Sequence, residues 1–303
     1  MKIFITTLAL FVCAMSYAQE IEVEIEVDDM EDEVMNMKNV AEGSVYPEDI
    51  ADAITEDLSD PKEKATAIFQ WVSQNIAYEI KLYEDFKTGE RNKRKGKRIP
   101  RSQMEEHNAE KVKRTLKKRN GICEDFALVY QAIADEANLE NDIVTGWIRN
   151  DPTKLRSVGV KHVWNVVKID GEWMHLDATY ASGFVDKYND FVFDYEPAGY
   201  LFPDKEQMQY THFPKKSPHI LGDSLLTKEL FKNRPIVGKG FFTHKITALS
   251  PNEMSISVKR GENFTIAFES ESELKNLTAT LAKVDKTYKA KHVQSGNRHN
   301  VII

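Results

Sequence analysis

The chain changes from loop to helix within Asn120-Gly121-Ile122-Cys123-Glu124-Asp125-Phe126-Ala127. Asn and Gly end one helix, and apolar residues recur at helical spacing after Cys123, so a core helix is expected to begin at or just after the cysteine. Backbone N–H groups at a helix start stabilise negative charge and favour a thiolate there. Glu124 and Asp125 oppose a thiolate, so we expect their carboxylates to point outward while the sulfur points into a cleft. The apolar face of this helix comprises Phe126, Val129, Tyr130, Ile133, Ala134 and Ala137.

A histidine and an aspartate that suit a thiol nucleophile follow downstream. His162 lies in Lys161-His162-Val163-Trp164-Asn165, and Asp177 lies in His175-Leu176-Asp177-Ala178-Thr179. A catalytic thiol needs a base that takes its proton and a group that orients the base, and imidazole and carboxylate fill these roles. Cys123, His162 and Asp177 are therefore the candidate catalytic residues.

The two segments that carry His162 and Asp177 are expected to form a β-hairpin over 162–169 and 172–179. Asp170-Gly171 between them is typical of a two-residue turn. In this register Trp164 faces Asp177 and His162 faces Thr179, so His162 and Asp177 are diagonal neighbours on one face of the sheet. Their backbones then lie about 7–8 Å apart, within reach of an imidazole and a carboxylate. A register shift of one residue would place them on opposite faces.

His175 is the competing base. It is expected on the same face, opposite Val166, and roughly 13 Å along the strand from the position opposite His162, which makes it the poorer candidate. One cysteine and scattered histidines give no recognisable zinc spacing, so neither a metal nor a cofactor is expected. The other histidines are expected to be surface or structural residues; they are His107, His212, His219, His244, His292 and His299.

Residues 1–18 are expected to be a secretory signal peptide, because one early lysine and a short apolar core precede small residues at Ser16 and Ala18. Lipidation at Cys13 is the alternative. Cleavage would remove Cys13 and place the mature chain in the periplasm or outside the cell, where cysteines usually pair. Cys123 would then be a lone thiol that is buried and inert, joined to another chain, or reactive.

The net charge of −7 at pH 7 argues against nucleic-acid binding by the whole chain. Residues 19–48 are expected to form an acidic, flexible arm, with nine acids and no base between Glu20 and Glu33. A basic insertion over 87–104 lacks aromatic residues, and we interpret it as a solvated loop rather than a polyanion site. No segment after the signal is apolar enough to span a membrane. The sequence makes no prediction of the oligomeric state.

The rest of the chain predicts an α+β protein. The core is expected over 49–200, with one helix that begins at the Asp60-Pro61 cap, a second helix over 105–118 that stops at Asn120-Gly121, and a strand over 142–148. Residues 201–240 are interpreted as an irregular connecting segment. Short alternating stretches over 241–303 predict a small β domain, which is too short for a complete sandwich.

Three separated motifs, in this order, resemble the transglutaminase-like superfamily. They run from Gly121 to Ala127, from His162 to Trp173 and from Leu176 to Tyr180, and the stretch from Ile68 to Tyr78 is similar to the leading helix of that family. Within the superfamily the chain resembles the kyphoscoliosis-peptidase-like branch. The clear resemblance covers residues 60–183, with weaker similarity up to Phe231.

The resemblance implies a papain-like α+β core, in which a helix bearing Cys123 packs on an antiparallel sheet bearing His162 and Asp177. It implies that Cys123 is the nucleophile, His162 the base and Asp177 the group that orients the base. The function expected from this is acyl transfer on protein or peptide amides through a thioester, by a cysteine peptidase, an amidase or a transglutaminase. The alternative is an inactive module that binds envelope protein or polymer, since the family includes members without catalysis.

Acyl transfer also needs hydrogen-bond donors for the developing oxyanion. The backbone N–H of Cys123 is the natural first donor. The Gln70 amide or the Trp71 indole is a candidate for the second, the alternative being that Trp71 belongs to the core and Gln70 to the surface. Trp164 is expected to line the cleft beside His162, to belong to the core, or both.

Overall fold

The computed structural model describes residues 4–5, 44–87, 100–149, 157–215, 226–254, 256–257, 259, 262–272, 274, 278–281, 286–289 and 291–302. Most of the expected leader, acidic arm and basic insertion lies outside these residues. The chain forms two compact units. We call Glu22–Thr145 with His162–Pro203 the helix–sheet unit, and Met1–Ile21, Gly146–Lys161 and Asp204–Ile303 the C-terminal unit. No helix among the described residues is both long enough and apolar enough to cross a membrane.

The helix–sheet unit begins with helices that the sequence predicted in part. Asp60 caps α3 by accepting hydrogen bonds from the N–H groups of Lys62 and Glu63, as expected. The second helix stops where predicted: α6 ends at Lys118, its C-cap Arg119 is left-handed with a φ of 53°, and Asn120-Gly121 follows as a short strand. The helices are α2 (Pro47–Thr55), α3 (Pro61–Asn75), α4 (Ile80–Lys87), η1 (Arg101–Gln103), α6 (Met104–Lys118), α7 (Cys123–Glu136) and α8 (Ala178–Ala181).

The strands of this unit are mostly antiparallel. The main sheet has the order β6-β5-β4, and β2 pairs in parallel with β3. A separate hairpin joins β7 to β8. The strands are β2 (Ala77–Tyr78), β3 (Asn120–Gly121), β4 (Asn141–Ile148), β5 (Val160–Ile169), β6 (Glu172–Leu176), β7 (Gly183–Val185) and β8 (Phe191–Phe193), of which Gly146–Ile148 and Val160–Lys161 belong to the C-terminal unit.

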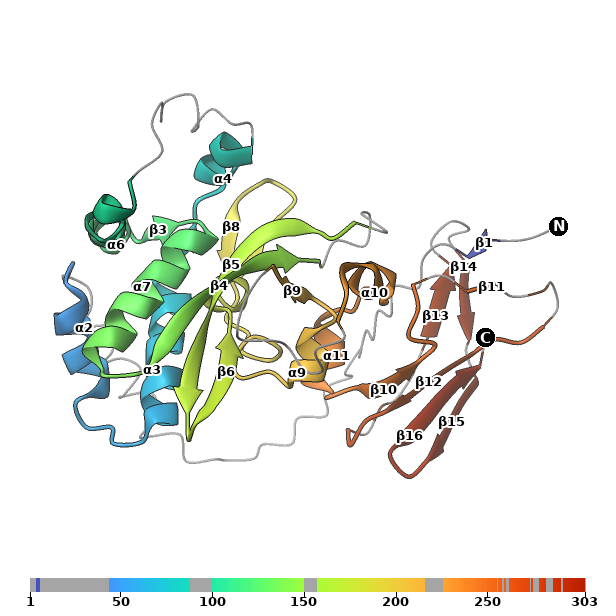
Figure 1. Ribbon diagram of the computed structural model, residues 1–303. Coiled ribbons are helices and arrows are strands. Elements are labelled where there is room, and N and C mark those ends of the chain that lie inside the picture. Colours follow the sequence, from blue (N-terminus) through green and yellow to red (C-terminus); the bar gives the residue numbers. More distant parts are fainter. Residues whose placement is uncertain are drawn as a thin grey trace. The chain divides into compact units, whose positions relative to one another are not determined.

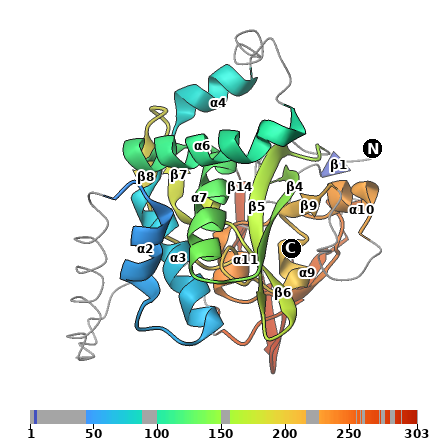
Figure 2. The same ribbon diagram turned by 60° about the vertical axis from the view of Figure 1, so that its left-hand side comes forward.

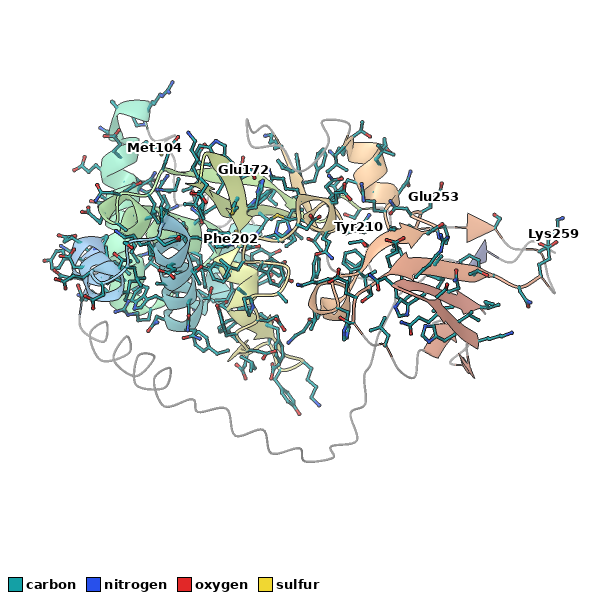
Figure 3. All side chains as sticks on the ribbon, turned by 90° about the horizontal axis from the view of Figure 1, so that it is seen from below. Met104, Glu172, Phe202, Tyr210, Glu253 and Lys259 are labelled. Atoms are coloured by element: carbon teal, nitrogen blue, oxygen red, sulfur yellow. The ribbon has the colours of Figure 1, made fainter. Side chains whose placement is uncertain are left out.

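The β5–β6 hairpin has the predicted register. Ile169 pairs with Glu172 and Val166 with His175, and the turn residues Asp170 and Gly171 have φ of 51° and 84°. Glu172, at the turn end of β6, is exposed (Figure 3). The prediction that the second strand continues to Thr179 is wrong. β6 ends at Leu176 because the side chain of the next residue, Asp177, caps α8 and turns the chain out of the sheet.

A single apolar core lies between the helices and this sheet. α2, α3, α6 and α7 lie on one side of the strands, and α7 packs against α2, α3 and α6 (Figures 1 and 2). On β5, the Asn165 side-chain amide donates a hydrogen bond of 3.0 Å to the Ala127 carbonyl, which ties the sheet to the first turns of α7. The largest buried side chains in the core include Phe69, Trp71, Phe126 and Tyr130.

The C-terminal unit contains the predicted β domain. Its main sheet has the order β10-β12-β16-β15, and β13 pairs with β14 and β1 with β11. The last residues of β4 pair with β9, and buried Arg149 donates to the backbone carbonyls of Lys232, Arg234 and Pro235. The elements are β1 (Phe4–Ile5), α9 (Lys205–Met208), β9 (His212–Pro214), α10 (Lys228–Asn233), α11 (Lys239–Thr243), β10 (Thr247–Ser250), β11 (Ile256–Ser257), β12 (Thr265–Glu269), β13 (Thr278–Leu281), β14 (Lys286–Lys289), β15 (Lys291–Ser295) and β16 (Arg298–Ile302).

Candidate active site

Cys123 is the first residue of α7 and is partly exposed. The expectation that both neighbouring carboxylates point outward is wrong for one of them. Glu124 is exposed and pairs with Lys111 at 2.5 Å, whereas Asp125 is buried. The Asp125 carboxylate accepts hydrogen bonds from the backbone N–H of Ile122 at 3.0 Å and from Arg114 at 2.7 Å. Two donors therefore hold the acid that fixes the start of the helix.

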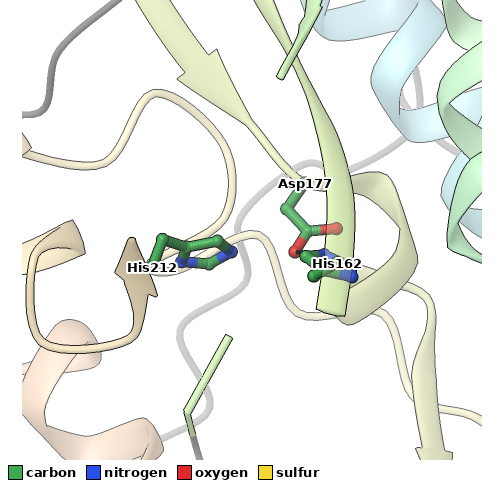
Figure 4. A group of neighbouring side chains, drawn as sticks. All are labelled: His162, Asp177 and His212. Carbon is green, nitrogen blue, oxygen red and sulfur yellow. Dashed lines mark hydrogen bonds and ion pairs between the residues drawn. The ribbon is translucent and has the colours of Figure 1, made fainter. Parts of the chain in front are cut away.

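His162 and Asp177 are brought together inside the helix–sheet unit. His162 Nε2 lies 2.7 Å from Asp177 Oδ2, and both residues are buried (Figure 4). Interaction with Cys123 also raises the pKa of the His162 ring. Because Nε2 faces the carboxylate, Nδ1 is the ring nitrogen left for the thiol. His212, also drawn in Figure 4, belongs to the C-terminal unit, where its Nδ1 lies 2.9 Å from the hydroxyl oxygen of Thr211.

Backbone hydrogen bonds hold Asp177 in place. Its Oδ1 accepts from the N–H groups of Thr179 at 3.1 Å and Tyr180 at 3.3 Å, which makes it the cap of α8. Its own N–H donates to the Tyr200 carbonyl at 2.8 Å. One carboxylate oxygen is thus committed to the backbone, and the other is directed at the imidazole.

Aromatic side chains enclose the His162 ring. Trp164 is buried and stacks on it with ring centroids 5.9 Å apart, and Tyr180 meets it edge-on at 5.1 Å. The Trp164 indole N–H donates to His175 Nδ1 at 3.0 Å. His175, the competing base, therefore accepts a hydrogen bond from Trp164 on the neighbouring strand.

The electrostatics of the pair favour a charged imidazole. Burial lowers the pKa of His162, but the charge of Asp177, the hydrogen bond that His162 donates to Asp177 and the interactions with Cys123 outweigh it. Together they raise the pKa of His162 from 6.5 to about 10. At neutral pH the ring is then an imidazolium held between a thiol and a carboxylate.

This raised pKa predicts a pH-dependent stability. A group whose pKa is higher in the folded state stabilises the fold fully below its unfolded pKa, and that stabilisation is lost as the pH rises through the folded pKa. The free energy of unfolding of the wild type should therefore fall from near pH 6.5 toward about pH 10. Urea titrations of the wild type and Asp177→Asn over this range check it, since the other titrating groups are shared. If the free energy of unfolding changed with pH in the same way in both proteins, Asp177 would not be the cause of the raised pKa of His162.

Gln70 and Trp71 both lie on α3. Trp71 is buried in the core under the Arg119 guanidinium, whose carbon lies 4.8 Å from the ring centroid, and Gln70 is partly exposed on the same helix. No hydrogen bond or ring contact of the described residues joins either side chain to Cys123. The expectation of an oxyanion donor on α3 therefore gains no geometric support.

Tyr78 is a site residue that the sequence reasoning did not single out. In the β2–β3 pair its register partner is Gly121, two residues before Cys123. Burial raises the pKa of the Tyr78 phenol, and the next largest cause is the charge of Cys123. The parallel pairing of two dipeptides far apart in the chain places Tyr78 opposite Gly121, and a strand of two residues is too short to show a periodic pattern in the sequence.

Part of the chain is similar to proteins of a known family. Residues 48–178 match the model of the transglutaminase-like superfamily. Kyphoscoliosis peptidase from Mus musculus is 24% identical over 199 residues, which cover 61% of this chain and 27% of that protein. The Homo sapiens protein of the same name is 24% identical over 186 residues, which cover 57% of this chain and 25% of that protein. The chain thus spans about a quarter of the length of these curated relatives.

A solved structure described as a TGase is also similar to the chain. It shares 16% sequence identity with a TM-score of 0.28, over 55% of this chain and 36% of that one.

Proposed function

Because residues 48–178 belong to the transglutaminase-like superfamily, we propose that this chain is a thiol-dependent acyl-transfer enzyme that acts on protein or peptide amides. The observation that carries the proposal is the buried His162 ring, which bonds Asp177 at 2.7 Å and also interacts with Cys123. Cys123 is the nucleophile, His162 the base and acid, and Asp177 the residue that fixes the ring orientation.

The reaction begins from a thiolate on Cys123 and an imidazolium on His162. The sulfur attacks the carbonyl carbon of the amide, a C–S bond forms, and the carbonyl π electrons move to the oxygen. When they return, the C–N bond breaks, and His162 donates its proton to the leaving amine or ammonia. A thioester remains on Cys123, with the imidazole neutral.

The neutral imidazole then activates the group that resolves the thioester. Water gives hydrolysis, and a lysine amine gives a crosslink. Our proposal puts hydrolysis first, because the curated relatives are named as peptidases. The partial exposure of Cys123 is compatible with access for both acceptors.

We also propose that the enzyme works outside the cytoplasm, in the periplasm or beyond the cell. The support is the signal-like segment over 1–18 and the absence of a second cysteine after Ala18. An unpaired thiol in that setting fits a reactive role better than a structural one.

The proposal predicts that Cys123 reacts with iodoacetamide at about pH 6, where an ordinary thiol is protonated and slow. His162→Gln should abolish this reactivity at low pH, because the imidazolium that stabilises the thiolate is gone. Alkylation is followed by mass spectrometry across the pH range. His175→Gln is the matched control, since it alters a buried histidine of the same hairpin that bonds Trp164.

Activity is then assigned with a glutamine-containing peptide, with and without an added primary amine. Cleavage of the peptide would indicate a peptidase. Release of ammonia in the absence of the amine would indicate an amidase, and incorporation of the amine into the peptide would indicate a transglutaminase. Free-cysteine reactivity in the wild type, with no product in any assay, would instead identify an inactive binding module.

A further inference from the structure

The start of α7 supplies the backbone N–H of Cys123 as a donor for an oxyanion. Cys123 is the first residue of the helix, so its N–H belongs to the turn in which such groups have no acceptor within the helix. A tetrahedral intermediate on the sulfur places its oxygen near this N–H. Acyl-transfer sites use more than one donor, so a second should come from another element.

The β2–β3 pair brings Tyr78 to this position. Tyr78 pairs with Gly121, and the N–H of Glu79 donates to the Gly121 carbonyl at 2.8 Å. Paired residues of neighbouring strands direct their side chains to the same face. A side chain at Gly121 would run into Asp125 in the first turn of α7, so the Tyr78 side chain leaves the strand toward that same turn.

The Tyr78 hydroxyl is free to donate. No described residue forms a hydrogen bond with it, and it is not among the fully buried polar atoms. Burial raises the pKa of this phenol, and the charges of Cys123, Tyr83 and Asp177 raise it further. The hydroxyl therefore keeps its proton at every pH at which the enzyme would work.

We propose that the Tyr78 hydroxyl is the second oxyanion donor and acts together with the Cys123 N–H. This inference rests on the acyl-transfer function proposed above. Trp71 belongs to the apolar core, with the Arg119 guanidinium over its ring. Tyr180 packs edge-on against His162 at 5.1 Å. Burial raises the pKa of its phenol, and the charges of Tyr78 and Cys123 also raise it, so Tyr180→Phe is included in the test below.

Two probes of Cys123 separate this role from a structural one. With p-nitrophenyl acetate, the sulfur bonds the carbonyl carbon, the π electrons form an oxyanion, and their return expels p-nitrophenolate with the C–O bonding pair. With iodoacetamide, a C–S bond forms as the C–I bond breaks and iodide leaves. Only the first reaction passes through an oxyanion, so only the first needs Tyr78.

The experiment measures both rates at one pH for the full chain. In Tyr78→Phe the acylation burst should slow about 10²-fold, the usual effect of losing one oxyanion donor, while alkylation stays at the wild-type rate. Tyr83→Phe is the matched control, because its ring lies 6.0 Å from that of Tyr78. It should leave both rates unchanged.

Each other result overturns the inference in a different way. Wild-type acylation in Tyr78→Phe means that the phenol donates nothing to the oxyanion. An equal loss of both rates means that Tyr78 acts on the thiolate or the fold, and a selective loss in Tyr180→Phe moves the role to that residue. If p-nitrophenyl acetate acylated the wild type no faster than Cys123→Ala, the proposed acyl-transfer function itself would be wrong.

Discussion

We expect Asp177→Asn to lower kcat by about 10⁴-fold, the loss that follows when the aspartate of a Ser-His-Asp triad becomes an amide. Without the Asp177 carboxylate, the two largest causes that raise the pKa of His162 disappear, and only the smaller interactions with Cys123 still oppose the lowering by burial. The pKa of His162 therefore falls in the variant, and the imidazolium that would stabilise a thiolate is less populated. The asparagine amide can also face Nε2 as a donor, which leaves the wrong ring nitrogen protonated toward Cys123. Steady-state kinetics on the peptide identified above measures the loss.

Asparagine caps a helix as well as aspartate does, so α8 is retained in this variant. The chain offers a matched control in Asp204, which caps α9 by accepting from the N–H groups of Glu206 and Gln207 in the same way. Asp204→Asn should leave kcat unchanged. A similar loss in both variants, or a loss in Asp177→Asn that tracks its unfolding, would show that the carboxylate acts through the cap rather than through the imidazole.

The hairpin geometry could be predicted from sequence because its determinants are local. Asp170-Gly171 sets the turn, the turn sets the register, and the register puts His162 and Asp177 on one face. The predicted end of the second strand was wrong because the Asp177 side chain bonds backbone N–H groups that follow it, and the chain leaves the sheet there. Asp177 bonds the N–H groups of Thr179 and Tyr180, and this cap ends the strand before Thr179 can pair with His162.

The remaining features depend on contacts that no local pattern reports. Asp125 is drawn inward by Arg114 and by the Ile122 N–H, although an acid at a helix start usually faces water. Tyr78 meets Gly121 through a strand pair of two residues on each side, formed across α4 and α6 in the sequence. The contact between His162 and Asp177 could therefore be predicted from the sequence, and the pairing of Tyr78 with Gly121 could not.

Gly121→Ala should lower kcat about 10²-fold and destabilise the fold by about 1–3 kcal/mol. A Cβ at this position would lie 2.6 Å from Asp125 Cβ, well inside contact distance. Asp125 or the strand must then move, and the bond between the Asp125 carboxylate and the Ile122 N–H is stretched. Because Ile122 directly precedes Cys123, the sulfur and its N–H shift relative to His162, and a displacement near 1 Å is enough for the predicted loss.

A loss of stability alone would also lower activity, so the control must destabilise without moving Cys123. Gly171→Ala serves, because Gly171 has a φ of 84° with open space around it, and alanine costs about 1–2 kcal/mol there. Denaturant titrations should show both variants weakened, and kinetics well below the transition should show the loss of kcat in Gly121→Ala only. Equal kcat in the two variants would mean that α7 absorbs the added methyl group without displacing the thiol, and that Gly121 is required for packing rather than for placing the nucleophile.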